Sequence, residues 1–89
     1  MCSSDLMLFV YDSEGPREFW MKNTRIPLSA AFLKADGTIV SISDMYPLDT
    51  RTTASAGPAQ YALEVNQGWF NAHHIAVGDR FEGLPKASP

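Results

Sequence analysis

The 89-residue sequence has little cysteine, no long apolar run and no concentration of positive charge. Its single cysteine, Cys2, excludes an intrachain disulfide and any cysteine-based metal cluster. No apolar stretch approaches the roughly 20 residues of a membrane-spanning helix, so we expect no transmembrane segment in this chain. Seven lysines and arginines are scattered among ten carboxylates, for a net charge of −3. Because no basic stripe exists, we expect no nucleic-acid partner.

Local catalytic and cofactor motifs are also missing. There is no G-x-S-x-G nucleophile motif and no Cys–His arrangement, and the six glycines form no phosphate-binding cluster. His73 and His74 are adjacent, so on a helix they would point about 100° apart and form no joint ligand pair. We expect no metal and no other cofactor. No local signal argues for an enzyme, although a spatial triad stays open.

The composition is that of an ordinary globular protein. Apolar residues make up 45% and charged residues 19% of the chain, and its length suits a single domain. We place that domain at residues 7–82, followed by a flexible tail at 83–89. Residues 1–6 read M-C-S-S-D-L, and C-S-S-D-L is the translation of a common sequencing-adapter end. We therefore expect a non-native start and a longer natural protein, which resequencing the gene would test.

Short β-forming stretches separated by turn residues predict a mainly β fold. The predicted strands are residues 7–11, 17–21, 28–34, 38–43, 59–65 and 79–82. The Asp36-Gly37 pair between two apolar stretches is a strong hairpin signal, and residues 12–16 form a turn cluster. Residues 68–74 predict a two-turn helix. Together these features predict a small single-domain sandwich, jelly roll or barrel with one short helix near the C-terminus.

Two segments are candidates for function. Residues 45–57 show no periodicity and are predicted to form a long loop, and loops of that length are often functional. Residues 19–24 read F-W-M-K-N-T and combine aromatic surface with a cation and several hydrogen-bonding groups, as ligand sites do. The alternative is structural, with Phe19 and Met21 in the core and Asn23 and Thr24 satisfying a tight turn.

At these residues the chain resembles the domain of unknown function 192 family. The resemblance is carried by F-W-M-K-N-T at 19–24, I-P-L at 26–28, D-G-T-I-V at 36–40, G-P-A-Q-Y-A-L-E at 57–64 and H-H-I-A-V-G-D at 73–79. It implies a compact β domain with one short helix, and periplasmic or otherwise exported localisation. It implies no reaction, because the family has no established activity.

Two residues depart from the family pattern. Ser29 stands where the family usually has aspartate. His74 stands where a helix-ending glycine is usual, so we expect His74 to adopt a left-handed conformation at a cost of about 1 kcal/mol.

The leading hypothesis is a small extracytoplasmic binding or accessory domain for a small molecule, glycan or peptide. Trp20 would offer a stacking face, Lys22 a cation, and Asn23 and Thr24 directed hydrogen bonds. Two residues of the long loop, Asp49 and Arg51, are weaker candidates for the same site. The first alternative is a hydrolase or lyase acting on an envelope polymer, with Glu64 or Asp49 as base. The second is a structural protein-interaction domain, and the oligomeric state stays open.

Overall fold

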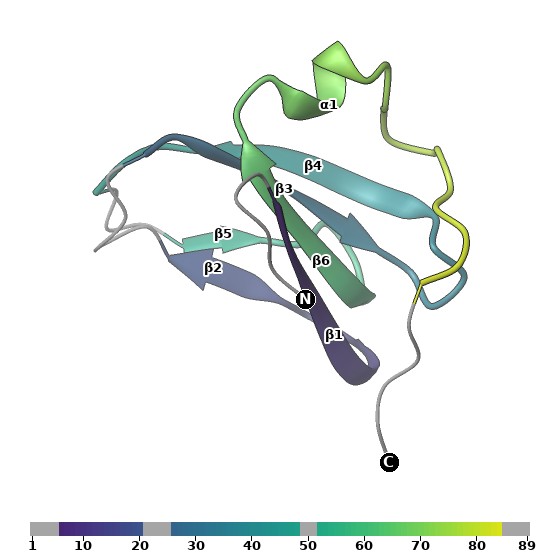
Figure 1. Cartoon of the computed structure of the whole chain (residues 1–89). Helices are drawn as coiled ribbons and strands as arrows, with labels where there is room; N and C mark the ends of the chain where they lie inside the picture. The colour runs from purple at the N-terminus through teal and green to yellow at the C-terminus, as the bar shows by residue number, and fades with distance from the viewer. Residues whose placement is uncertain (1–5, 21–25, 49–51, 85–89) are drawn as a thin grey trace.

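The computed structural model describes residues 6–20, 26–48 and 52–84, and in these ranges the chain is mainly β with one short helix, as predicted (Figure 1). In chain order the elements are β1 (Leu6–Gly15), β2 (Glu18–Trp20), β3 (Leu28–Leu33), β4 (Ile39–Met45), β5 (Thr52–Ala54), β6 (Ala59–Asn66) and α1 (Trp69–Ala72). None of the helical segments in these ranges is long and apolar enough to cross a bilayer.

The main sheet has four antiparallel strands in the order β1-β6-β3-β4. The predicted hairpin forms its β3–β4 edge. Gly37 closes the turn at φ +91°, a conformation that glycine adopts without the steric penalty of a side chain. Asp36 supports the turn by accepting a hydrogen bond from the backbone N–H of Thr38 (2.9 Å). The turn residues and the apolar residues on both sides of them therefore favour the same structure, the β3–β4 hairpin.

A second sheet consists of β2 and β5, paired antiparallel with Trp20 opposite Thr52. It lies across the main sheet from α1 (Figure 1). The prediction that residues 45–57 form one unstructured loop is therefore wrong, because β5 lies within that segment. Its three residues carry no apolar alternation, and their partner strand is over thirty positions earlier.

Alternation along the strands of the main sheet gives two apolar faces. Ala31, Leu33, Tyr61, Leu63 and Val65 face α1 and pack with its Phe70. Residues one position away, including Ala30, Phe32 and Ala62, face the opposite side and pack with Met45 and Ala59. Both faces of β3 are therefore buried, from Ser29 to Leu33. A fully covered central strand requires small and apolar residues on both sides.

The helix is one turn long, shorter than the predicted span 68–74. It ends because His74 adopts φ +57°, as expected for the residue after the C-cap. The N–H of His74 donates to the carbonyl of Asn71 (3.1 Å), and the N–H of Ile75 donates to that of Phe70 (2.9 Å). These two bonds form a Schellman motif, and Ile75 and Phe70 share the same apolar cluster.

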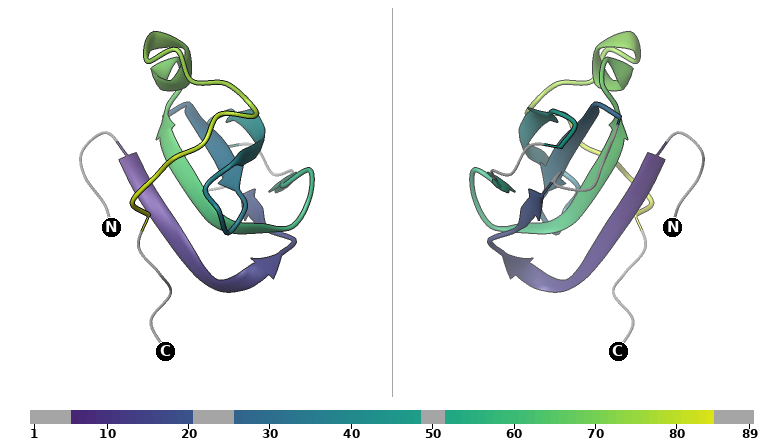
Figure 2. Two further views of the ribbon diagram at one scale, coloured as in Figure 1. Left: turned by 90° about the vertical axis from the view of Figure 1, so that its right-hand side faces the viewer. Right: turned by 90° about the vertical axis from the view of Figure 1, so that its left-hand side faces the viewer.

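The chain after α1 crosses the α1 face of the main sheet and reaches the hairpin (Figure 2). There the N–H of Phe81 donates to the carbonyl of Gly37, and the N–H of Ile39 donates to that of Asp79. A full strand at 79–82 was predicted, but only an isolated bridge between Thr38 and Arg80 forms. Side-chain packing of Phe81 and Leu84 holds this segment in place of a continuous ladder.

At the other end, β1 continues through the predicted turn cluster 12–16 as far as Gly15. The pairing with β6 is irregular between Val10 and Gly15. Arg17 holds this bend, because its Nε donates to the carbonyl of Ala59 (3.1 Å) while its guanidinium lies 3.8 Å from the centre of the Tyr11 ring. The turn residues therefore bend the strand without ending it.

Candidate functional site

The structure places one of the predicted ligand-binding residues, Trp20, at the end of β2. The other five, Lys22, Asn23, Thr24, Asp49 and Arg51, lie outside the described residues. Two flanking positions are nevertheless informative, because Trp20 pairs with Thr52. Trp20 directly precedes residues 21–25 in the sequence, and Thr52 directly follows residues 49–51. These two flanking residues lie side by side. The two sequence stretches singled out as functional meet at this end of the small sheet.

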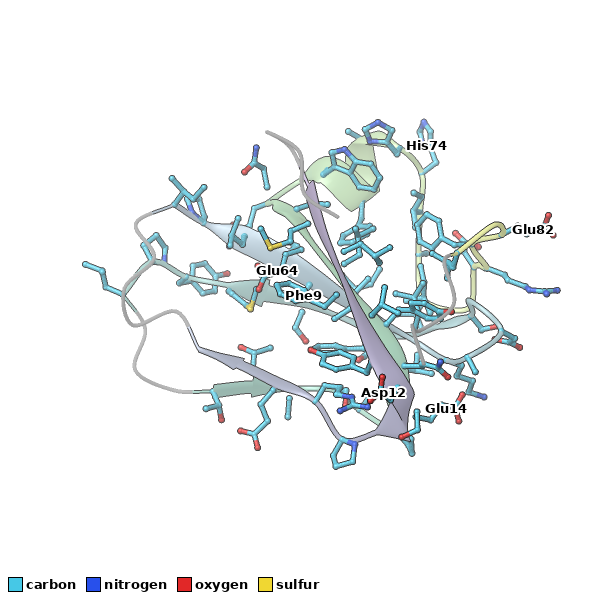
Figure 3. All side chains as sticks on the ribbon, turned by 60° about the horizontal axis from the view of Figure 1, so that its bottom comes forward. Phe9, Asp12, Glu14, Glu64, His74 and Glu82 are labelled. Carbon is cyan, nitrogen blue, oxygen red and sulfur yellow. The ribbon has the colours of Figure 1, made fainter. Side chains whose placement is uncertain are left out.

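Glu64 is the most unusual charged residue in the described part of the chain. It lies on the central strand β6, between Ala30 of β3 and Met7 of β1. Its position in the alternation points it away from α1, toward the side occupied by β2 and β5. Figure 3 shows Glu64 beside Phe9 on this face. An ionisable side chain on a central strand covered by a second sheet is uncommon in proteins.

Burial has a direct electrostatic effect on this carboxyl group. Glu64 is half-buried, and the loss of water raises its pKa above the ordinary value for glutamate. Within ranges 6–20, 26–48 and 52–84, its carboxylate has no hydrogen-bond donor and no cationic partner. Glu64 therefore accepts a proton more readily than a surface glutamate, and a carboxylate can accept hydrogen bonds at both of its oxygens.

Tyr11 lies on the same face and is linked electrostatically to Glu64. Burial raises the pKa of the Tyr11 hydroxyl; the Arg17 guanidinium lowers it, and the negative charge of Glu64 raises it further. Arg17 is already engaged, since its backbone N–H donates to the hydroxyl of Ser55 (3.2 Å) and its side chain holds the β1 bend. We therefore assign Arg17 a structural role and take Glu64 and Tyr11 as ionisable groups of this face with raised pKa values.

The arrangement suits recognition of a hydrogen-bond donor or a positively charged group next to an apolar body. Glu64 supplies the acceptor, and Phe9 and Met7 supply half-buried apolar neighbours. A carboxyl group whose pKa is raised by burial holds its proton to a higher pH than an ordinary glutamate does, and general acid–base catalysis uses shifts in this direction.

Sequence reasoning treated Glu64 only as a possible base in the enzymatic alternative. The alternation of Tyr61, Leu63 and Val65 with Ala62 and Glu64 is typical of a strand with one solvent-facing side. In the structure both sides of β6 are covered, and Ala62 is fully buried. The available signal was Ala62, a small apolar residue on the face assigned to solvent.

The two histidines have structural surroundings. The His73 ring stacks on that of Trp69, with centroids 4.2 Å apart, and its Nδ1 lies 2.8 Å from the Trp69 carbonyl oxygen. His74 ends the helix. In the described ranges, no group of three or more His, Cys, Asp or Glu side chains is arranged to hold a metal ion.

Comparison with known proteins identifies relatives but no established activity. Residues 1–83 match the domain of unknown function 192 (DUF192) family, described as "Uncharacterized ACR". No curated protein shows significant similarity to the chain.

Two crystal structures have similar folds. A protein of Sinorhizobium meliloti 1021, described as a "putative transcription regulator", is 36% identical with a TM-score of 0.81. A protein of unknown function from Novosphingobium aromaticivorans DSM 12444 is 31% identical with a TM-score of 0.80. Each alignment covers 90% of this chain but only 63% and 58% of the respective relative, so the chain spans about three-fifths of their length.

Proposed function

We propose that this chain, which belongs to the domain of unknown function 192 family, is a small ligand-binding domain. Its site would lie between the two sheets, at the end where Trp20 pairs with Thr52. The observation that carries the proposal is Glu64, a half-buried carboxyl group without a partner among the described residues. Keeping an ionisable group in such a place lowers stability, and ligand recognition is a reason for a protein to retain it.

The chemistry of the flanking segments defines the class of ligand. Trp20 offers a stacking face, and Lys22 a cation for an anionic group. Asn23 and Thr24 would supply donors and acceptors, and Asp49 and Arg51, close in sequence to Thr52, are weaker candidates for the same role. Together with Glu64, these side chains suit a small molecule, glycan or peptide rich in hydroxyl or amide groups.

A thermal-shift screen against envelope glycans, peptides, nucleotides and metal ions tests this function. A ligand that binds only the folded state stabilises it by RT ln(1 + [L]/Kd), so the melting temperature rises with ligand concentration. The screen is run on the wild-type protein and on the variants Lys22→Ala, Trp20→Ala and Glu64→Gln. The exposed Glu18 of β2 provides a matched control, Glu18→Gln. A shift that the three variants lose and the control keeps supports the site.

Burial of Glu64 also favours a second candidate function, a hydrolase or lyase acting on an envelope polymer. A carboxyl group whose pKa is raised by desolvation is suited to act as a general acid or base. Glu64→Gln separates the two functions. If Glu64 is catalytic, the variant loses turnover and keeps most of its affinity; if it only binds, the variant loses affinity.

DNA binding, which the description of the Sinorhizobium relative would suggest, finds little support in this chain. The net charge is −3, and of the described cations Arg17 is engaged in the β1 bend and Arg80 in a bond to the Asp36 carbonyl. A protein that binds DNA neutralises phosphates with clustered positive charge. Fluorescence anisotropy with duplex DNA at low salt tests this point, and salt-sensitive binding would contradict it.

We further propose that the natural protein is exported, because the family resemblance implies a periplasmic or otherwise extracytoplasmic location. The supporting observation is the resemblance alone. Fractionation of cells that express the natural gene, with a periplasmic and a cytoplasmic marker, tests it. Recovery with the cytoplasmic marker would contradict export.

A further inference from the structure

The face of the main sheet opposite Glu64 carries a second polar feature, at a cleft beside α1. The cleft has a volume of about 270 Å³ and lies between the helix and strands β3 and β4. Its lining residues are Ser29, Ile42, Asp44, Gly68, Phe70, Asn71 and Ile75. The cleft is thus separated from the Glu64 side by the thickness of the sheet, and it is independent of the function proposed above.

A carboxylate is held in a defined orientation at this cleft. Ser29 and Asp44 are directly opposite each other in the β3–β4 ladder. Ser29 is only 2% exposed and is the one buried polar side chain in the described ranges. Its hydroxyl donates to Oδ1 of Asp44, at 2.5 Å. The buried hydroxyl fixes the exposed carboxylate, and a hydrogen bond to a charged acceptor is stronger than one between neutral groups.

Among residues 6–20, 26–48 and 52–84, Ser29 is the one hydrogen-bond donor to the Asp44 carboxylate, and it uses Oδ1. Across the parts of the chain that the structure describes, neither an ammonium nor a guanidinium group pairs with this carboxylate. Asn71 of α1 adds an amide at the opposite wall of the cleft. The polar groups are therefore a full negative charge and a neutral amide, a combination that attracts a cation and disfavours an anion.

The rest of the lining is apolar and open. Ile42, Phe70 and Ile75 contribute aliphatic and aromatic surface. At Gly68, which begins α1 with φ +89°, an added Cβ would meet no atom within 4 Å. Gly68 therefore adds no side chain to this wall of the cleft, and the space beside its Cα is open. A short apolar chain can lie against these side chains while its charged end reaches Asp44.

We propose that this cleft binds an alkylammonium group, a primary amine on a short aliphatic chain. The ammonium would donate to Asp44 and Asn71, and the methylene groups would pack on Ile42, Phe70 and Ile75. The same chemistry occurs in a free aliphatic amine and in a lysine side chain of a peptide.

NMR titration of the protein with butylammonium chloride tests the proposal. We expect saturable shifts of the Gly68 and Asn71 amide signals, with affinity weakened about fivefold or more in Asp44→Asn, which keeps an oxygen acceptor for Ser29 but has no charge. Asn71→Ala, a surface substitution, should also weaken binding and covers the case in which Asp44→Asn fails to fold. Glu18→Gln, at an exposed position of β2 away from the cleft, should bind as the wild type does.

Butanol and butyrate are the neutral and anionic controls, and N-acetyl-lysine N-methylamide represents a peptide lysine. Tighter binding of the lysine derivative than of butylammonium assigns the site to a peptide, and the reverse order assigns it to a free amine. Three results would overturn the proposal: no saturable shift, an equal response to butanol, or unchanged affinity in both Asp44→Asn and Asn71→Ala.

Discussion

Trp20 and Thr52 are directly opposite each other in the antiparallel pair β2–β5. The pair joins the F-W-M-K-N-T segment to the aperiodic segment that follows β4, although thirty-one positions separate the two residues in the chain. The small sheet lies across the main sheet from α1, on the side that Glu64 faces. The proposed site rests on the Trp20–Thr52 pairing and on the half-buried carboxyl group of Glu64.

Glu64 is predicted to make stability depend on pH. Burial raises its pKa in the folded state, so the folded protein holds this proton more tightly than the unfolded chain does. The stabilisation is therefore present below the unfolded pKa and is lost as pH rises through the higher folded pKa. We expect Glu64→Gln to melt at a higher temperature than wild type at pH 7, with a smaller difference at pH 4. Equal differences at both pH values would refute this.

His74→Gly is predicted to stabilise the protein by about 1 kcal/mol, because glycine adopts the left-handed C′ conformation without the penalty of a side chain. Denaturant unfolding measures the change. His73→Gly is the neighbouring control, and it should destabilise the protein, since it removes the stacking on Trp69 from a residue with negative φ. A His74→Gly variant that is less stable than wild type would show that the left-handed backbone of His74 does not destabilise the protein.

Gly37→Ala is predicted to release the C-terminal segment from the hairpin. An added Cβ would lie 2.1 Å from the carbonyl oxygen of Phe81, and φ is +91°. We expect a loss well above the roughly 1 kcal/mol of a positive φ alone. Gly83→Ala, with φ +73° and open space around the Cβ, measures the conformational cost without the clash. Hydrogen exchange at Phe81 should increase in Gly37→Ala only, and protection in both variants would contradict the account.

Arg17→Lys is predicted to destabilise the bend between β1 and β2 by about 1–2 kcal/mol. Lysine keeps the charge but cannot both cover the Tyr11 ring and donate to the Ala59 carbonyl as the guanidinium does. Chemical denaturation measures the loss. Lys34→Arg, at an exposed position, is the control for exchange between the two cations and should leave stability nearly unchanged. Equal stability of Arg17→Lys and wild type would show that the contact is dispensable.

The parts of the fold that could be predicted are those specified by neighbouring residues. The Asp36-Gly37 turn and its apolar flanks predicted the β3–β4 hairpin, and the left-handed His74 followed from its place after the helix. By contrast, β5 could not be found, because three residues without apolar alternation become a strand only through their partner β2. The Glu64 environment was missed for the same reason: the sheet that buries it forms from distant segments.

The candidate site was predictable only in part. Aromatic and polar residues in F-W-M-K-N-T indicated a binding surface, and the structure places its first two residues on β2. The Ser29–Asp44 bond required the β3–β4 register as well as the two residue types, and register depends on the exact position of the turn. A hydrogen bond between side chains on neighbouring strands can be predicted only when the strand register is known.

The most direct test of the binding site is a thermal-shift comparison of wild type, Glu64→Gln, Lys22→Ala and Asp44→Asn against the same ligand panel. The account predicts at least one glycan, peptide or small molecule that raises the melting temperature of wild type and of Asp44→Asn, which is altered on the opposite face. The same compound should have much less effect on Glu64→Gln and Lys22→Ala. A ligand that stabilises all four proteins equally, or a panel that stabilises none, would contradict a binding site between the sheets and favour a protein-interaction domain.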